Sequence, residues 1–182
     1  MNMEEFTGIA LNAITDLKFD FLCLWAVQPD AVHAAENPPV QQLPSGSGVE
    51  RYKSMNYAVI DPTVKHSRLA STPILWSDDI FKGSPGLWSE ANDSQLRHGL
   101  AQPSFNARGR VGLLSLARKD KKIGADEFTE LAPITRAFAD AVYAKLSDLE
   151  GCWSGIMMSC LPSGKAKYCA GRRMARLQKR LA

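Results

Sequence analysis

The chain has 182 residues, of which 45% are hydrophobic and 23% charged, and its formal net charge is +3. A chain of this length and composition can bury one good core, so one domain is expected. Its four cysteines show no CxxC pair and no metal-ligand spacing, and no signal peptide or membrane-length apolar run precedes them. These features exclude a disulfide-rich scaffold and a membrane-spanning protein, and they predict a reduced, cytoplasmic protein without a membrane partner.

The positive charge is concentrated at the C-terminal end. Residues 151–182 carry seven Lys and Arg and no acid, which leaves fifteen basic against nineteen acidic residues before them. Such a segment attracts phosphate without regard to sequence and could give weak, salt-sensitive nucleic-acid binding. We favour the other interpretation, a disordered basic tail whose charge has no function.

The N-terminal elements are read from the spacing of apolar residues. Met3 to Leu17 is predicted to form a helix because its apolar residues recur at helical spacing. Phe19 to Val27 is predicted to be a buried strand. Residues 28–48 contain four prolines, no aromatic residue and a Ser-Gly-Ser-Gly run, and this composition predicts a loop that is long for a compact domain.

Asp61 and Pro62 mark the start of the next predicted helix. The carboxylate can accept backbone N–H groups of the first turn, and proline at the first helical position sacrifices no hydrogen bond. This helix is expected to run to about Ala70. Pro73 then interrupts regular structure, so Ile74 to Trp76 is expected to be a short apolar segment whose tryptophan points inward.

The second half of the chain adds two helices and a strand to the prediction. A helix is expected over about Leu87 to Arg97 and ends at Gly99, whose freedom at positive φ suits a C-terminal cap. Val111 to Leu116 is predicted to be a mostly apolar strand, introduced by a hairpin turn at residues 108–110. Asp126 to Leu149 forms the last predicted helix, which its proline bends or restarts.

Several side chains of the central stretch suggest a binding site. Tyr57, Asp61 and Trp76 fall within twenty residues of one another, and a carboxylate between aromatic side chains suits the wall of a small pocket. Taken one at a time, each residue has a simpler interpretation. Asp61 is then only a helix cap, Tyr57, Trp76 and Tyr52 are core residues, and Ser115 is a hydroxyl satisfied by its neighbours. Only their joint spacing favours a ligand.

No catalytic or metal-binding pattern accompanies these residues. His66 is expected on the polar side of its helix, and His33 and His98 have no acid or cysteine partner at motif spacing. The sequence shows no nucleophile–base pair, glycine-rich phosphate loop or metal-ligand spacing. A small hydrolase or transferase is therefore the least favoured hypothesis, and no cofactor is expected.

The spacing of these residues also carries a family resemblance. Three motifs occur in order, namely Y(x)8DP from Tyr52 to Pro62, PxxW from Pro73 to Trp76 and HGL(x)2P from His98 to Pro103. Together they make the chain similar to the autoinducer-binding domain of LuxR-type quorum-sensing regulators, over roughly residues 3–22 and 49–150. The resemblance implies an α/β fold, an α/β/α sandwich with a central antiparallel sheet.

The resemblance implies a ligand, N-acyl-homoserine lactone, and a role for five residues. Asp61 would accept a hydrogen bond from the amide N–H of the ligand. Tyr57 and Ser115 would hydrogen-bond its acyl carbonyl region. Trp76 and Tyr52 would line the cavity, in which an apolar tail supplies burial and a few fixed polar groups supply orientation.

Two features of the wider domain follow from the same resemblance. Gly99 matches a structural glycine of the family, and the helix at residues 126–149 corresponds to one that helps form a dimer. We therefore expect an autoinducer-binding-like domain over residues 1–150, paired as a homodimer or as a mixed dimer with a full-length family member.

The chain departs from the family pattern over residues 22–48 and after Glu150. In the family, a tryptophan shortly before the position of Tyr52 donates to the lactone carbonyl. Here Gly48 stands near that place and has no side-chain donor. A DNA-reading helix-turn-helix domain is expected after Glu150, but the basic tail of residues 151–182 stands there instead.

Frame changes in the gene would explain both departures. Read in a shifted frame, the codons of Tyr168 to Ala182 permit the string LRWTADGKTAEEIG, which is similar to the opening of such a helix-turn-helix domain. In the other shifted frame, the codons of residues 22–45 permit the family's lead-in to the missing tryptophan. We therefore expect a full-length ancestor that was altered by an upstream frame change, later restored, and by a second one near Glu150.

The favoured function is a lactone-responsive transcriptional activator of quorum sensing. The resemblance is strongest to regulators of phenazine antibiotic biosynthesis, and promoter DNA would be a partner only where the helix-turn-helix is restored. The alternative is a truncated regulator without DNA binding, which acts as a dimerisation antagonist or has no function. An antagonist would leave a dimer one DNA-reading domain short, and such a dimer cannot grip a two-fold operator.

Overall fold

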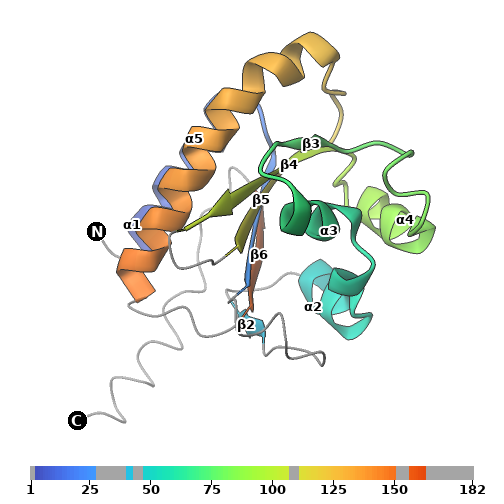
Figure 1. The fold of residues 1–182 in the computed structure, drawn as a ribbon, viewed down its shortest axis with the longest axis horizontal. Helices are drawn as coiled ribbons and strands as arrows, with labels where there is room; N and C mark the ends of the chain where they lie inside the picture. Colours follow the sequence, from blue (N-terminus) through green and yellow to red (C-terminus); the bar gives the residue numbers. More distant parts are fainter. Residues whose placement is uncertain (1–2, 28–39, 43–46, 107–110, 151–155, 163–182) are drawn as a thin grey trace.

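The computed structural model describes residues 3–27, 40–42, 47–106, 111–150 and 156–162. These residues form three layers, with one sheet between two layers of helices (Figure 1). Helices α1 (Met3–Asp16) and α5 (Ala125–Glu150) cover one face. The other side carries four shorter elements, namely α2 (Ser47–Ser54), the 3-10 helix η2 (Tyr57–Val59), α3 (Pro62–Leu69) and α4 (Pro85–Asp93). The arrangement confirms the predicted α/β/α sandwich.

The sheet has the strand order β2-β6-β1-β5-β4-β3 within the part of the chain that the structure describes. Its neighbouring strands pair antiparallel except for β2 and β6, which pair parallel. The strands are β1 (Phe21–Val27), β2 (Val40–Gln42), β3 (Ile74–Leu75), β4 (His98–Phe105), β5 (Val111–Arg118) and β6 (Ile156–Pro162).

The larger core lies between the sheet and the long helices. Leu100 of β4 and Leu114 and Leu116 of β5 pack there against apolar residues of α1 and α5. Tyr143 of α5 crosses this core and donates its hydroxyl to the Trp25 carbonyl at 2.8 Å. Burial raises the pKa of Tyr143 far above its usual range, so the phenol stays a neutral donor that joins α5 to β1.

A smaller core lies on the opposite face of the sheet. Val64 of α3 packs there with Trp25, Ala101 and Leu113. The helix that carries Val64 begins at the cap residue Asp61. Asp61 has extended backbone angles, and its side chain accepts the N–H of Thr63 at 2.8 Å. The predicted helix start at Asp61 is therefore confirmed, as is its end, because α3 stops one residue before Ala70.

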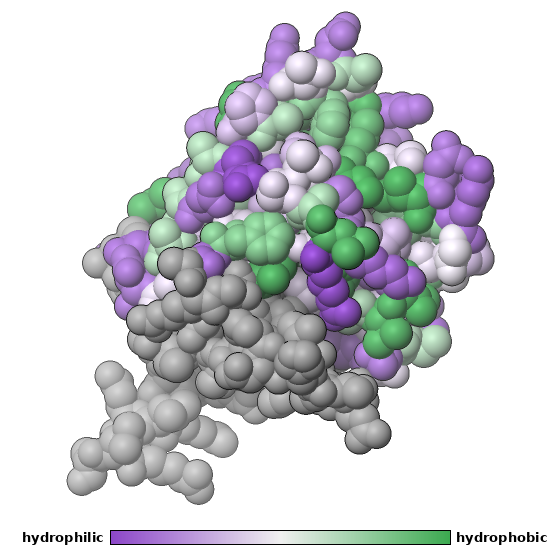
Figure 2. All heavy atoms as spheres, viewed as in Figure 1, coloured by the Kyte–Doolittle hydropathy of each residue, from purple (hydrophilic) through white to green (hydrophobic). Residues whose placement is uncertain are grey.

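The surface on the side of α2, α3 and α4 mixes apolar and polar side chains. Met55, Val59, Ile60 and Leu69 are large apolar side chains that are exposed there. In Figure 2, polar residues (purple) lie between the apolar ones (green), so the apolar surface seen in this view is divided into separate areas. Among the helices that the structure describes, none combines the length and apolarity needed to cross a membrane.

The helix predictions are confirmed, except that the end predicted for one helix is wrong. The first and last helices lie at Met3–Asp16 and Ala125–Glu150, with Pro133 inside the latter. The helix predicted over 87–97 instead begins two residues earlier and ends at Asp93. Gly99 does not cap it but lies in β4, a strand that the sequence analysis missed. The strand is buried on both faces, so it shows no alternation of polar and apolar residues.

The short apolar segment after Pro73 is confirmed as the edge strand β3. A further strand, β6, lies within the segment for which no regular structure was predicted. In its register with β1, Cys160 is the partner of Cys23. Cys23 takes part in a disulfide, which differs from the expected reduced state. The spacing of the four cysteines in the sequence did not reveal this disulfide.

Some predictions fall where little or nothing is described. The loop predicted over residues 28–48 holds β2 and the start of α2, and its remaining residues lie outside the described ones. The predicted turn at residues 108–110 also lies outside, although Phe105 and Val111 on either side pair with each other. His33, residues 151–155 and the rest of the basic tail from residue 163 are likewise not described.

Candidate functional site

Four of the five predicted ligand-binding residues come together on the side of α2, α3 and α4. Tyr57 is buried in a cluster with Phe81 and Leu87, against which Tyr52 and Trp76 pack. The Tyr52 and Tyr57 rings meet edge to face, with centroids 5.8 Å apart. The fourth residue, Asp61, joins the cluster through a hydrogen bond from Tyr52.

Asp61 is the buried acceptor of this site. Its Oδ1 accepts the backbone N–H of Thr63 at 2.8 Å and the Thr63 hydroxyl at 2.7 Å. Its Oδ2 accepts the Tyr52 hydroxyl at 2.8 Å. The two interpretations of Asp61 are therefore compatible, since one oxygen caps α3 and the other faces the aromatic cluster.

Tyr52 is a neutral hydrogen-bond donor toward Asp61. Burial raises its pKa well above the ordinary value, and the nearby Asp61 carboxylate raises it further. Ionising the phenol would place a second negative charge beside the carboxylate in a region from which water is largely excluded. The pair thus presents one carboxylate charge and one firmly held proton.

The aromatic wall of the site continues from Trp76. Its ring meets Phe81 edge to face, and Phe81 stacks on Trp88 at 4.5 Å between centroids. The Trp76 Nε1 is buried and has no hydrogen-bond partner within the described residues. A buried N–H donor without a partner is costly, and this one lies in the cluster that also contains Tyr52.

Gly99 makes room for the Trp76 ring. A Cβ atom at Gly99 would lie 2.6 Å from Cε3 of Trp76 and 2.7 Å from the Leu116 carbonyl oxygen. The Trp76 backbone N–H also donates to the Gly99 carbonyl at 2.8 Å. Gly99 is thus structural because it allows close packing, and not because it caps a helix.

Tyr57 lies in the cluster, but its hydroxyl points to a partner that the sequence analysis did not identify. It donates to Glu90 Oε1 at 2.8 Å, and Arg51 forms an ion pair with the same carboxylate at 3.0 Å. The hydrogen bond from Arg51, followed by that from Tyr57, lowers the Glu90 pKa. This network joins α2, η2 and α4. Its partners are far apart in the sequence, so no local pattern could have predicted it.

Ser115 lies apart from this group, on β5. Its Cα partners in the sheet are Ala101 and Cys23. Leu113, two residues earlier, packs against Val64 of α3, and side chains two apart in a strand share a face. Ser115 therefore faces the layer of α3, and only 8% of its surface is exposed. Its role toward a ligand stays a prediction.

The His66 side chain contacts the backbone of its own segment. His66 Nε2 contacts the Thr72 carbonyl oxygen at 2.7 Å, so this side chain holds the connection that follows its own helix. Within the described residues, no group of three His, Cys, Asp or Glu side chains could hold a metal ion. Asp61, Tyr52 and Trp76 provide hydrogen-bonding groups that are surrounded by aromatic side chains.

Sequence comparison relates the chain to a known family and to named proteins. The profile of the autoinducer binding domain matches residues 2–146. The transcriptional activator PhzR of Pseudomonas fluorescens is 54% identical over 155 residues, which are 82% of this chain and 61% of PhzR. The transcriptional activator SolR of Ralstonia nicotianae is 30% identical over 93% of this chain and 69% of its own length. This chain thus spans somewhat less than two thirds of PhzR.

Solved structures share the fold. SdiA in complex with octanoyl-rac-glycerol superposes with a TM-score of 0.65 at 22% identity, over 82% of this chain and 61% of that one. The N-acylhomoserine-lactone-dependent LuxR-family factor CepR2 of Burkholderia cenocepacia gives a TM-score of 0.59 at 22% identity, over 72% of this chain and 77% of that one. The chain belongs to the autoinducer-binding domain family of LuxR-type regulators.

Proposed function

We propose that this chain is the ligand-sensing part of a LuxR-type transcriptional activator that responds to an N-acyl-homoserine lactone. One observation carries the proposal: a buried carboxylate, Asp61, and the indole N–H of Trp76, which has no hydrogen-bond partner among the described residues, belong to one aromatic site. The lactone has matching groups, since its amide N–H suits the carboxylate, its carbonyl oxygens suit an N–H donor and its acyl chain suits an apolar wall.

The ligand amide would be held by Asp61. Its Oδ1 is occupied by Thr63, so the ligand N–H would approach Oδ2 and share it with the Tyr52 hydroxyl. An ionised carboxylate oxygen can accept more than one hydrogen bond. Tyr52 would then keep Asp61 oriented while its own ring forms part of the wall.

Tyr57 and Ser115 would serve the acyl carbonyl region. The Tyr57 hydroxyl donates to Glu90 in this structure, so donation to a ligand requires that it leave Glu90. Ser115 faces the layer of α3 from the sheet, in the same row as Leu113. With Gly48 in place of a tryptophan donor, Trp76 is the residue we expect to contact a ligand carbonyl.

Isothermal titration calorimetry tests this function on the full chain. We expect saturable binding of N-butanoyl-, N-hexanoyl- or N-octanoyl-homoserine lactone, and none of the corresponding ring-opened acyl-homoserine. Asp61→Asn retains a good helix cap but loses the charge, and its affinity should fall by roughly tenfold or more because a charge-assisted hydrogen bond is lost. Absence of saturable binding for all three lactones would overturn the proposal.

For the whole protein we propose control of phenazine antibiotic biosynthesis as a dimer, because PhzR is a relative at 54% identity. The proposed sensing domain covers residues 1–150, and β6 of the basic segment 151–182 adds a strand to its sheet. Promoter DNA is a partner in this proposal only through a helix-turn-helix domain that a restored reading frame would supply. Resequencing the gene across codons 20–50 and from codon 148 onward tests that point.

A second function is a dimerisation antagonist, for which α5 offers an exposed apolar side chain to a partner helix. Ile134 on that helix is 47% exposed, and the segment after Glu150 carries seven Lys and Arg and no acid. Size exclusion of this chain mixed with full-length PhzR should then show a mixed dimer, and the mixture should bind operator DNA less well than PhzR alone. Two separate elution peaks and unchanged operator binding would exclude this function.

A further inference from the structure

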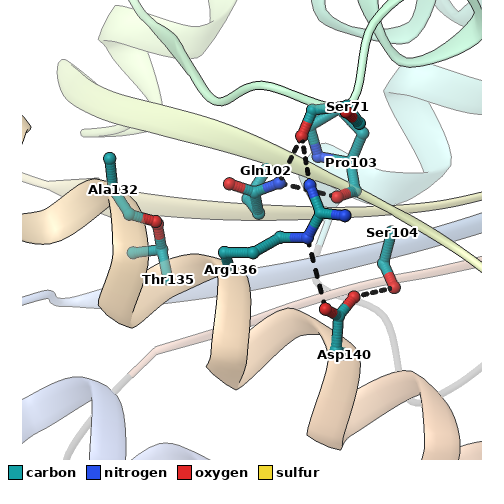
Figure 3. A network of polar contacts seen from close by, with 8 residues as sticks. All are labelled: Ser71, Gln102, Pro103, Ser104, Ala132, Thr135, Arg136 and Asp140. Carbon is teal, nitrogen blue, oxygen red and sulfur yellow. Dashed lines mark hydrogen bonds and ion pairs between the residues drawn. The ribbon is translucent and has the colours of Figure 1, made fainter.

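The carbonyl oxygen of Ser71 receives two hydrogen bonds from different layers of the molecule (Figure 3). Arg136 Nη1 of α5 donates to it at 2.6 Å, and Gln102 Nε2 of β4 donates to it at 3.0 Å. Gln102 is fully buried and also donates to the Pro103 carbonyl at 2.7 Å. One backbone carbonyl is thus held from both the sheet and the long helix.

Ser71 lies in the connection between α3 and β3, where the sheet offers no ladder partner. β3 pairs with β4 only through Ile74 with Ala101 and Leu75 with Leu100. Before Ile74, hydrogen bonds from side chains, rather than strand pairing, hold the backbone in place. Besides the contacts to Ser71, His66 Nε2 contacts the carbonyl oxygen of Thr72 at 2.7 Å.

The guanidinium of Arg136 is itself held in place on α5. Its Nε donates to Asp140 Oδ2 at 3.2 Å, and the other oxygen of Asp140 accepts the hydroxyl of Ser104 at 2.7 Å. Figure 3 shows the series running from Ser71 through Arg136 and Asp140 to Ser104. A planar guanidinium bridges two acceptors in a fixed geometry, which a flexible ammonium cannot reproduce.

We propose that Arg136 is a positioning residue for the ligand site, acting through Ser71; this inference rests on the proposed function. The connection that Arg136 holds leads from α3, whose first turn Asp61 caps, to β3 and Trp76. The hydrogen bond from Arg136 to the Ser71 carbonyl thereby fixes the positions of both polar groups of the site, the Asp61 carboxylate and the Trp76 indole N–H. Ligand binding on one side of the sheet and the placement of α5 on the other are thereby coupled, and such coupling is reciprocal.

Arg136→Met on the full chain removes the charge and both hydrogen bonds while keeping a helix-forming residue of similar length. Lys145→Met is the matched control, because Lys145 forms an ion pair with Asp148 within α5. The first measurement is hydrogen exchange of backbone amides over residues 70–76 without ligand. In Arg136→Met these amides should exchange about fivefold faster, the factor expected for one lost hydrogen bond, and in Lys145→Met at the wild-type rate.

The second measurement is the affinity for N-hexanoyl-homoserine lactone, together with the melting temperature of each variant. Arg136→Met should bind about fivefold more weakly with little change in melting temperature, because the side chains of its ion pair with Asp140 are 43% and 51% exposed and such pairs contribute little to stability. Arg136→Lys should restore part of the affinity, since it keeps one donor. If Arg136→Met does not fold, Arg136→Gln replaces it in both measurements.

The outcomes separate this inference from the proposed function. Unchanged exchange over residues 70–76 overturns the inference, and so does faster exchange with unchanged lactone affinity. If the wild-type chain binds no lactone, the proposed function fails and with it the role of Arg136 at a lactone site, while the exchange rates still decide whether α5 holds the connection.

Discussion

Tyr52 and Asp61 form a hydrogen bond, from Oη to Oδ2 at 2.8 Å, that links the helix cap of α3 to the aromatic site. The Tyr52 pKa is raised, first by burial and then by Asp61, so the proton stays on the phenol. One oxygen of the Asp61 carboxylate is therefore hydrogen-bonded by Tyr52 and the other by Thr63.

Tyr52→Phe keeps the ring and removes only this donor. We expect the free energy of unfolding to fall by about 1–2 kcal/mol, because a partly buried carboxylate oxygen loses its partner. Urea denaturation monitored by circular dichroism measures the change. Asn92→Ala, which removes a hydrogen bond to the Trp88 carbonyl within α4, serves as the control for loss of an ordinary helix-surface contact, and an equal loss in both variants would contradict the special role of Tyr52.

Gly99→Ala should destabilise the fold and displace Trp76. The new methyl group would lie within 3 Å of the Trp76 ring and the Leu116 carbonyl oxygen, and overpacking of this kind costs about 1–3 kcal/mol. Gly8→Ala is the matched control, because a Cβ there meets nothing within 4 Å. In the interior of α1 the added methyl should stabilise by about 0.5–1 kcal/mol. Thermal melts of both variants test the opposite signs.

Glu127→Gln tests the buried cation of β5. Only 2% of the Arg118 surface is exposed, its guanidinium lies over the Phe19 ring, and its ion pair with Glu127 measures 2.8 Å. Two of its nitrogen atoms, Nε and Nη1, have no partner within the described residues, so losing the carboxylate leaves a buried charge poorly compensated. We expect a loss of about 2 kcal/mol in urea denaturation.

The exposed pair of Lys145 and Asp148 provides the contrast for Glu127→Gln. Asp148→Asn should change stability by less than about 0.5 kcal/mol, as is usual for surface pairs. Equal effects of Glu127→Gln and Asp148→Asn would show that burial of Arg118 does not govern the strength of its ion pair.

Glu90 should make stability depend on pH in the acid range. The hydrogen bond from Arg51, and then that from Tyr57, lowers its pKa in the folded state. A carboxyl group whose pKa is lowered by folding contributes stability above its unfolded pKa of about 4.3 and loses that contribution as pH falls through the folded value. Glu90→Gln should therefore be less stable than wild type at neutral pH, and the difference should shrink in acid.

Urea midpoints at about pH 7 and about pH 3 compare stability above and below the unfolded pKa of the carboxyl group. Asp79→Asn, which removes the exposed partner of Lys82, is the control and should leave stability nearly unchanged at neutral pH. A Glu90→Gln difference that stays constant between the two pH values would contradict the assigned role of the Arg51–Glu90–Tyr57 network.

The sequence predicts elements whose signals are local. The spacing of apolar residues predicts α1 and α5, and the Asp61–Pro62 pair predicts the start of α3. The strand β4 was missed because Gly99 and Pro103 both argue against a strand. Its burial on both faces also removes the alternation that would have revealed it.

The candidate site was predictable as a set of residues but not as a set of contacts. The motifs placed Tyr52, Tyr57, Asp61 and Trp76 in one region, and the structure groups them. The partner of Tyr57, however, is Glu90, thirty-three residues away, and Arg136 reaches Ser71 from sixty-five residues away. Contacts between residues so far apart depend on how the layers pack, and the spacing of residues in the sequence does not predict that packing.

The ligand site is tested most sharply by titrating the isotope-labelled chain with N-hexanoyl-homoserine lactone and following the indole N–H resonance of Trp76. We expect this resonance to shift and saturate, because a donor without a partner among the described residues gains a ligand carbonyl, and we expect Asp61→Asn to weaken the response. A resonance that stays in place at saturating lactone would show that Tyr52, Asp61 and Trp76 do not form the ligand site.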